Sequence, residues 1–259
     1  MTGLTTRRCM DPQSTCAMAV MAKAPRPGRA KTRLCPPLLP RQAAELSAAF
    51  LRDVTENIAL AARAAPIHGY VAYAPAGEEH YFDSHIADGT KLVLADGSPP
   101  MPSGVKGFGR SLLHAAQALF ASGYRAVCLV NSDSPTLPTS LLIEAAHVLL
   151  AAGEHVVLGP ADDGGYYLLG MNQPHAHLFA DIAWSTQSVA ATTYARAVSL
   201  EFDVVTLPTW YDVDDAASLA RLLEEAEGRP AGLQRYSAPV TMAWIGRSFP
   251  IGRMSLAAQ

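Results

Sequence analysis

Basic side chains gather near the start of this chain on a segment rich in proline and glycine. They are Lys23, Arg29, Lys31 and Arg33. An apolar run, residues 17–21, precedes them and is typical of a buried strand. Open α/β sheets bind ligands at the carboxyl ends of strands, and Lys and Arg heads with backbone N–H groups favour negative charge there. The segment therefore predicts a polyphosphate site, although a solvated basic loop would have the same composition.

A carboxylate holds the equivalent position after a second strand. Asp133 follows the unbroken apolar run 126–130, which is typical of a parallel strand buried on both faces, and Pro135 shapes the turn after it. Asp133 would point into the same crevice as the basic segment, unless it only closes an Asx turn. A carboxylate facing a polyphosphate favours a divalent cation between them, Mg²⁺ or Mn²⁺, because Mg²⁺ prefers one or two carboxylates with phosphate oxygens and water.

Two further acidic segments flank predicted strands. Asp212, Asp214 and Asp215 lie between a strand and a helix, where Asp214 or Asp215 is a good N-cap and one of Asp212 and Asp214 could reach a metal. Residues 162–166, Asp-Asp-Gly-Gly-Tyr, place two carboxylates beside glycines that allow close backbone approach. We expect substrate contacts beyond the phosphates at 162–166, although Asp-Gly-Gly also makes an ordinary hairpin turn.

Other motifs carry weaker signals. The segment 103–110 is glycine-rich and precedes a helix, which suits an anion site or a flexible lid. Its spacing is neither the dinucleotide fingerprint nor a P-loop. His175 and His177 have no third ligand nearby in the sequence, so we expect no metal there. The Gly-x-Ser-x-Gly elbow of hydrolases is absent from the sequence.

Composition narrows the class of protein. The 259 residues are 49% hydrophobic with a net charge of −3, which argues against a partner such as nucleic acid. No apolar run approaches the roughly 18 residues of a membrane helix, and the N-terminal arginines lack the apolar run of a secretory signal. The four cysteines form no Cys-x-x-Cys pair and indicate free thiols. We therefore expect a cytoplasmic protein without a membrane partner.

Helical and strand patterns alternate along the chain. Apolar residues at three- and four-residue steps predict helices over 41–64, 109–122, 140–152, from a cap at Ser185 to about 198, and 215–227. Short apolar runs predict strands at 17–21, 68–74, 91–95, 126–130, 156–158, 166–169 and 204–207. This alternation predicts an α/β fold with three layers, α/β/α, around a mostly parallel sheet.

The chain ends differ from this pattern. We expect a flexible leader over residues 1–15, one domain over 16–227 and a C-terminal tail over 228–259. The tail has no clear period, so it is expected to pack on the domain or on a second subunit, the latter giving a homodimer.

Five motifs, taken in order, resemble a known family. They are Lys23-x-Pro25-x-Pro27-Gly28-x-x-Lys31-Thr32-Arg33-Leu34, Asp133-Ser134-Pro135-Thr136-Leu137, Gly159-Pro160-Ala161-x-Asp163-Gly164-Gly165-Tyr166-Tyr167-Leu168-x-Gly170, Trp184-Ser185-Thr186 and Asp212-Val213-Asp214. Together they are similar to the bacterial DUF2064 family, GT-A-like glycosyltransferases of the arsenosugar-biosynthesis type. That family resembles phospholactate guanylyltransferases and the molybdenum-cofactor nucleotidyltransferases. The resemblance spans residues 17 to about 225 and implies the Rossmann-like nucleotide-diphospho-sugar transferase fold.

The resemblance also implies roles for individual residues. Lys23, Lys31 and Arg33 would act on the triphosphate as catalytic cations. Asp133 and Asp214 would hold the metal, with Asp212 as a further ligand. The implied nucleotide or substrate contacts are Ala22, Gly28, Thr32, Lys106, Asp163, Gly164, Gly165, Tyr166 and Trp184. The segment 106–112 departs from the family's Gly-Asp-Leu-Gly-x-Arg-Met, and its lysine in place of a glycine suggests recognition of an acidic co-substrate.

Three functions stay open at this point. The single Asp133 with the basic segment favours Mg²⁺-dependent nucleotidyl transfer from a nucleoside triphosphate to a small anionic acceptor that bears a phosphate or phosphonate, with release of pyrophosphate. The alternative is glycosyl transfer from a nucleotide-sugar, with Asp163 as base. The third is a non-catalytic nucleotide-binding protein on the same scaffold.

Overall fold

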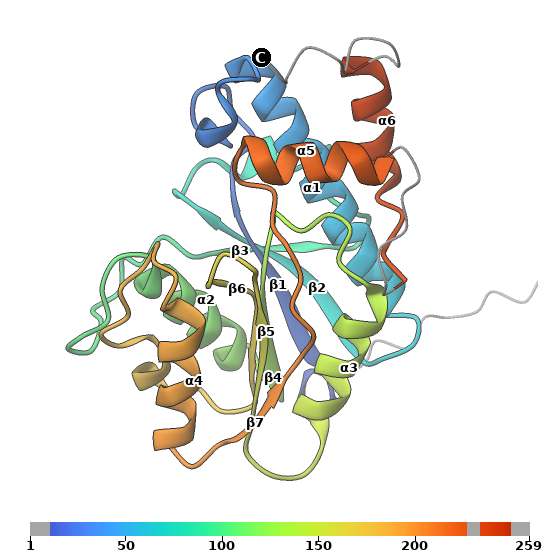
Figure 1. Ribbon diagram of the computed structural model, residues 1–259. Coiled ribbons are helices and arrows are strands. Elements are labelled where there is room, and N and C mark those ends of the chain that lie inside the picture. The colour runs from blue at the N-terminus through green and yellow to red at the C-terminus, as the bar shows by residue number, and fades with distance from the viewer. Residues whose placement is uncertain (1–10, 227–233, 250–259) are drawn as a thin grey trace, which may run out of the picture.

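A seven-stranded sheet forms the centre of the computed structural model, which describes residues 11–226 and 234–249 (Figure 1). The strands are β1 (Cys16–Lys23), β2 (Ile67–Ala74), β3 (Lys91–Leu94), β4 (Ala126–Asn131), β5 (His155–Pro160), β6 (Tyr166–Met171) and β7 (Asp203–Thr206). Their order is β3-β2-β1-β4-β6-β5-β7, and β6 alone runs antiparallel to its neighbours β4 and β5. This arrangement confirms the predicted mostly parallel sheet and its seven strands.

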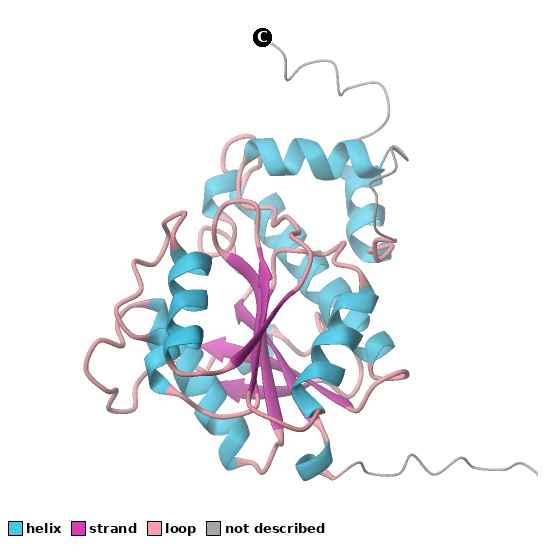
Figure 2. Cartoon of the chain, turned by 60° about the horizontal axis from the view of Figure 1, so that its bottom comes forward, coloured by secondary structure: helices cyan, strands magenta, loops and turns pink. Residues whose placement is uncertain are grey.

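Helices cover both faces of the sheet, as Figure 2 shows. They are α1 (Pro40–Ala61), α2 (Phe108–Ala121), α3 (Thr139–Leu150), α4 (Val189–Ser199), α5 (Ala216–Ala226) and α6 (Pro239–Ser248). Short 3₁₀ turns lie at Pro12–Ser14, Thr32–Leu34, Glu79–Tyr81 and Ala176–Phe179. In Figure 1, α2 and α4 lie on one side of the sheet and α1 and α3 on the other, which confirms the three-layer prediction.

The alternation of side chains along β1 divides the core into two apolar clusters. Met18 and Val20 pack in the cluster of α1 and α3, whereas Ala17 and Ala19 pack in the cluster of α2. A strand buried on both faces must be apolar throughout, since successive residues point to opposite faces. The centre of the sheet is therefore covered on both faces, which leaves the ends of its strands for a ligand.

Strand directions bring the predicted site segments to one end of the sheet. Strands β1, β4, β5 and β7 are parallel to one another, and their carboxyl ends share an edge with the first residue of β6. The segments that follow or precede these ends are 24–34, 132–135, 161–165 and 207–215. Four stretches far apart in sequence therefore meet at one edge, as such folds require of a ligand site.

The start of α4 differs from the prediction. Ser185 has a φ of +64°, which is unsuited to a helix N-cap, and α4 begins after Ser188. In the first turn of α4, the Ala190 N–H donates to the carbonyl of Gly164 in the turn between β5 and β6. The start of α4 is thus held against a segment that is distant in the sequence.

The C-terminal tail contains a helix that the sequence pattern did not reveal. Helix α6 packs on α1, where its first N–H groups, those of Val240 and Thr241, donate to the buried Asp53 carboxylate at 3.1 and 2.6 Å. The capping side chain thus comes from α1 and not from the local sequence, which has Ala238 at that position. Residues 1–10 of the expected leader and residues 227–233 and 250–259 around the tail lie outside the described residues. The homodimer stays a prediction.

Among the described residues, no helix is both long and apolar enough to cross a membrane.

Candidate active site

A cavity of about 650 Å³ lies at the carboxyl edge of the sheet. It combines residues from the basic segment, the turn after β4, the turn before β6 and the segment before α5. Of the site residues expected from the sequence, it is lined by Ala22, Lys23, Lys31, Thr32, Arg33, Asp133, Asp163, Gly165, Tyr166, Trp184 and Asp214. The structure thus brings the basic segment and the acidic turns into one cavity.

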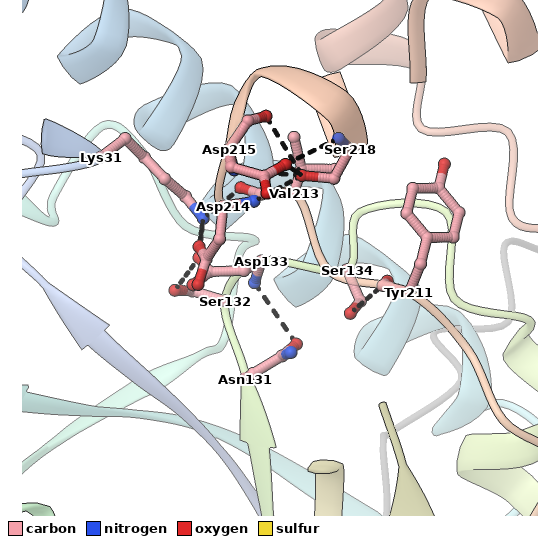
Figure 3. A network of polar contacts seen from close by, with 10 residues as sticks. All are labelled: Lys31, Asn131, Ser132, Asp133, Ser134, Tyr211, Val213, Asp214, Asp215 and Ser218. Carbon is pink, nitrogen blue, oxygen red and sulfur yellow. Dashed lines mark hydrogen bonds and ion pairs between the residues drawn. The ribbon is translucent and has the colours of Figure 1, made fainter. Parts of the chain in front are cut away.

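Lys31 is the centre of the charged wall of this cavity (Figure 3). Its Nζ atom lies 2.8 Å from Asp133 Oδ1 and 2.7 Å from Asp214 Oδ1. The ammonium also donates to the Val213 carbonyl at 2.7 Å, and it lies 5.5 Å from the centre of the Phe50 ring of α1. Only 6% of the Lys31 side chain is exposed. A buried cation therefore joins the two acidic segments.

Backbone and side-chain hydrogen bonds fix the two aspartates relative to each other. The Val213 N–H donates to the Asp133 carbonyl at 2.9 Å, and Ser134 Oγ donates to the Tyr211 carbonyl at 2.9 Å. The Ser132 hydroxyl donates to Asp133 Oδ1 at 2.7 Å. These contacts hold the turn after β4 against the segment before α5, so the carboxylates are placed before any ligand arrives.

The two aspartates and Lys31 shift one another's pKa values. Burial would lower the pKa of Lys31, but the nearby carboxylates of Asp133 and Asp214 raise it above its ordinary value. Burial raises the pKa of Asp133 against the opposing effect of Lys31, whereas the Lys31 ammonium brings the pKa of Asp214 below its ordinary value despite burial. Each charge therefore depends on its partner, as expected of a buried ion cluster.

The sequence left open which aspartate caps α5, and the structure assigns this role to Asp215. Asp215 Oδ1 accepts from the Ser218 N–H at 2.8 Å, which leaves Asp214 for the cavity. Asp212 is not among the residues that line the cavity, and its expected role as a further metal ligand stays a prediction. Burial and the neighbouring charges of Asp214 and Asp163 raise the pKa of Asp212 to about 7.

The carboxylates of Asp133 and Asp214 are close enough together to share one cation. The Lys31 ammonium occupies the position between their Oδ1 atoms, so a divalent cation would bind these carboxylates beside it, through their other oxygens. Among the described residues, no three His, Cys, Asp or Glu side chains gather closely enough to form a metal site by themselves. A divalent cation here would need oxygens from its ligand as well, which is the coordination that Mg²⁺ adopts with phosphates.

Three expected contact residues lie outside the cavity lining. Gly28 and Gly164 have φ values of +72° and +90°, a backbone conformation that favours glycine. A Cβ atom on Gly164 would lie 2.2 Å from the Gln187 carbonyl oxygen, so this glycine allows two loops to pack closely. Lys106 is exposed, and its carbonyl accepts from the Gly109 N–H at the start of α2. The suggested role of Lys106 in recognising an acidic co-substrate therefore has no support in this geometry.

The cavity also contains residues that sequence reasoning missed. Phe108, at the start of α2, is 49% exposed and meets the Trp184 ring edge to face at a centroid distance of 5.7 Å. Trp184 in turn packs on Gly109, where an added Cβ would lie 2.9 Å from the Trp184 ring. The presence of Phe108 in the glycine-rich segment 103–110 was the only sign of this contact in the sequence. The direction of its ring depends on packing against Trp184, which is distant in the sequence.

Comparisons with known proteins agree with this picture. The model of a family described as "Uncharacterized protein conserved in bacteria (DUF2064)" matches residues 57–186, half of the chain. A solved structure described as a "putative nucleotide-diphospho-sugar transferase" from Desulfovibrio desulfuricans G20 is 25% identical over 90% of this chain and 95% of that one, with a TM-score of 0.73. These findings confirm the expected family and fold.

More distant structures share less of the architecture. A cytidylyltransferase from Leptospira borgpetersenii serovar Hardjo-bovis is 10% identical over 90% of this chain and 94% of that one, with a TM-score of 0.49. Rv0371c from Mycobacterium tuberculosis H37Rv, in complex with manganese, is 18% identical over 81% of this chain and 98% of that one, with a TM-score of 0.45. A comparison with curated proteins finds no significant match.

Proposed function

Because the chain belongs to the bacterial DUF2064 family and has the fold of a nucleotide-diphospho-sugar transferase, we propose that it is a nucleotide-dependent transferase. More specifically, it transfers a nucleotidyl group from a nucleoside triphosphate to a small phosphate- or phosphonate-bearing acceptor and releases pyrophosphate. The observation that carries this proposal is the Lys31 ammonium between Asp133 and Asp214, in a cavity lined by three further cations.

The basic wall suits the charge changes of this reaction. The acceptor oxygen attacks the α-phosphorus in line, the bond to the bridging oxygen breaks, and pyrophosphate leaves with the electron pair. Lys23, Arg29 and Arg33 line the cavity and would stabilise the negative charge that builds on the leaving phosphates. Lys31 would hold the two carboxylates in place. The protein thus contributes positioning and electrostatic stabilisation without a covalent intermediate.

A divalent cation, Mg²⁺ or Mn²⁺, would complete the site. Asp133 and Asp214 would hold it together with oxygens of the bound phosphates. When bound, such an ion supplies electrophilic stabilisation of phosphoryl oxygens.

Pyrophosphate release is the direct test of the proposal. The purified protein, given Mg²⁺, each nucleoside triphosphate and a panel of phosphate and phosphonate acceptors, is expected to release pyrophosphate only when an acceptor is present. Asp133→Asn is expected to lower turnover on the order of 10²-fold, by analogy with the removal of one stabilising group. Asp215→Asn is the matched control, because this neighbouring residue only caps α5 and asparagine caps helices well.

Glycosyl transfer is the second candidate, favoured by the similarity to the Desulfovibrio structure described as a putative nucleotide-diphospho-sugar transferase. In that case Asp163, which lines the cavity and accepts from the Gly165 N–H, would serve as the base for an acceptor hydroxyl. Release of a nucleoside diphosphate from a nucleotide-sugar, with no turnover of any triphosphate, would reject nucleotidyl transfer. Thermal stabilisation by nucleotide and Mg²⁺ without any product would instead indicate a non-catalytic binding protein.

A further inference from the structure

A smaller cavity of about 150 Å³ adjoins the active-site cavity. The two share Met21, Phe108, Ser132, Asp133 and Tyr166 in their walls. Because Asp133 borders both, a group in the smaller cavity would lie beside the carboxylate that the proposed function assigns to the metal and the phosphates. We refer to the smaller cavity as the side chamber.

The side chamber lies on a different flank of the sheet from the charged cluster. Its wall includes Leu112 of α2 and Leu129 of β4, which belong to the apolar cluster under α2. Lys31, by contrast, lies next to Phe50 of α1. A phosphate chain held by the basic segment would therefore occupy the α1 flank, and the side chamber stays available for a second reactant on the α2 flank.

The wall of the side chamber is mainly apolar. Met21, Phe108, Leu112 and Leu129 contribute hydrocarbon or aromatic surface. The polar residues of the wall are Asn131, Ser132, Asp133 and Tyr166. An apolar cavity of roughly 150 Å³ has the size that accommodates a benzene molecule. Hydroxyl groups of a polyol would lose hydrogen bonds to water there and find few replacements. The chamber thus selects for a compact carbon group.

One polar group in this wall lacks a partner. The Tyr166 hydroxyl oxygen is buried and makes no hydrogen bond with any described residue. Burial raises the pKa of Tyr166, so the phenol keeps its proton at neutral pH and stays a donor. Buried hydroxyls in native proteins nearly always have a partner. Tyr166 lines both cavities, so a ligand oxygen that displaces the atoms covering this hydroxyl would be the missing partner.

We propose that the side chamber binds the carbon skeleton of the acceptor. The acceptor is then a small phosphate or phosphonate whose organic group is uncharged, has the bulk of a six-membered carbon ring and carries one oxygen that accepts from Tyr166. A polyhydroxylated sugar phosphate does not fit. This identification rests on the proposed nucleotidyl transfer, and it names the class of the second substrate.

Direct binding measurements test the chamber independently of turnover. With full-length protein, ¹⁹F NMR titration of 4-fluorophenyl phosphate is expected to show saturable binding that phenyl phosphate displaces. Glucose 1-phosphate should compete at least roughly tenfold more weakly, because its hydroxyls lose hydrogen bonds in the apolar chamber. Equal or better competition by glucose 1-phosphate would overturn the proposal.

Two variants locate the binding. Leu112→Phe should fill the chamber and abolish binding of 4-fluorophenyl phosphate, with nucleotide affinity unchanged within about twofold, since additivity errors at separate sites are of that size. Nucleotide binding in this variant also shows that it is folded. A parallel loss of nucleotide affinity in a folded Leu112→Phe protein would mean that the chamber holds the nucleobase and would overturn the assignment.

Tyr166→Phe keeps the shape of the chamber and removes only the hydroxyl. It should weaken the best-binding of the three hydroxyphenyl phosphates by about fivefold, the effect of one typical hydrogen bond, and leave phenyl phosphate unchanged. An equal effect on both ligands would contradict the donor role of Tyr166.

Failure of this inference is distinguishable from failure of the proposed function. Pyrophosphate release with sugar phosphates, and not with aryl or alkyl phosphates, would retain nucleotidyl transfer and reject the chamber as the acceptor site. Saturable aryl phosphate binding that Leu112→Phe abolishes, without pyrophosphate release from any triphosphate, would support the chamber and reject nucleotidyl transfer.

Discussion

The two ends of the sheet bury polar groups in different ways. At the carboxyl end, Lys31 is buried as an ammonium between two aspartates. Toward the amino end, His68 Nδ1 and the Tyr70 hydroxyl each lie 2.9 Å from the Tyr124 hydroxyl. Burial lowers the pKa of His68, helped by the charge of Lys91, so this second cluster is neutral at pH 7.

The difference shows at which end of the sheet the protein buries charged groups despite their cost in desolvation. Buried ion pairs lose much of their attraction to desolvation, and apolar or neutral groups often stabilise a fold as well or better. The amino end, where the sheet needs only stability, carries the neutral cluster. Charges that persist at the carboxyl end are better explained by a ligand, since perturbed ionisable groups concentrate at functional sites.

The largest expected effect comes from removing the buried cation. Lys31→Met leaves Asp133 and Asp214 without the positive charge between them, so we expect a loss of about 3–5 kcal/mol in the free energy of unfolding, as for other broken buried pairs. Urea unfolding followed by circular dichroism measures it. Lys91→Met, at an exposed lysine near the neutral cluster, is the control and should change stability by less than about 0.5 kcal/mol. Equal losses in the free energy of unfolding for the two variants would contradict the proposed difference between the two ends of the sheet.

A smaller effect is expected from a cation on the cavity wall. Arg33→Ala should raise the dissociation constant for a nucleoside triphosphate with Mg²⁺ by about tenfold, because one charge-assisted hydrogen bond to phosphate is lost. Isothermal titration calorimetry gives this value. Lys106→Ala removes a cation outside the cavity and should leave it unchanged. A comparable loss in Lys106→Ala would restore the sequence-based role of this residue and extend the charged region beyond the cavity.

The smallest effect concerns the neutral cluster and depends on pH. Because burial lowers the pKa of His68, the unfolded chain takes up a proton at this residue near pH 6.5 while the folded chain does so only at lower pH. Just below pH 6.5 the unfolded state binds more protons, so the contribution of His68 to stability is lost as the pH falls. His68→Gln should flatten the decline between pH 7 and pH 5 by about 0.5 kcal/mol, a small value because His68 is only half-buried. The free energy of unfolding is measured at pH 5, 6 and 7 for both proteins. An equal decline in the two proteins would contradict this role of His68.

Local patterns predicted the strands and most helices. A strand buried on two faces is an unbroken apolar run, and a helix with one buried face has apolar residues at three- and four-residue steps. The meeting of Lys31 with Asp133 also followed from local reasoning, since both come after parallel strands. What failed depends on contacts between distant segments. Helix α6 is capped by Asp53, 187 residues from Val240, and Gly164 is required by the approach of Gln187. The side chamber likewise exists only because β1, β4, β6 and α2 enclose it.

The clasp between Asp53 and α6 has a practical consequence for anyone who shortens or extends this protein. Asp53 precedes its two amide donors by 187 and 188 residues, so this contact forms only when Val240 and Thr241 are present. A protein cut at residue 234 would keep a buried carboxylate without those donors and would uncover the apolar surface of α1 that Trp244 shields. Any shortened form of the protein should therefore keep α6 together with α1.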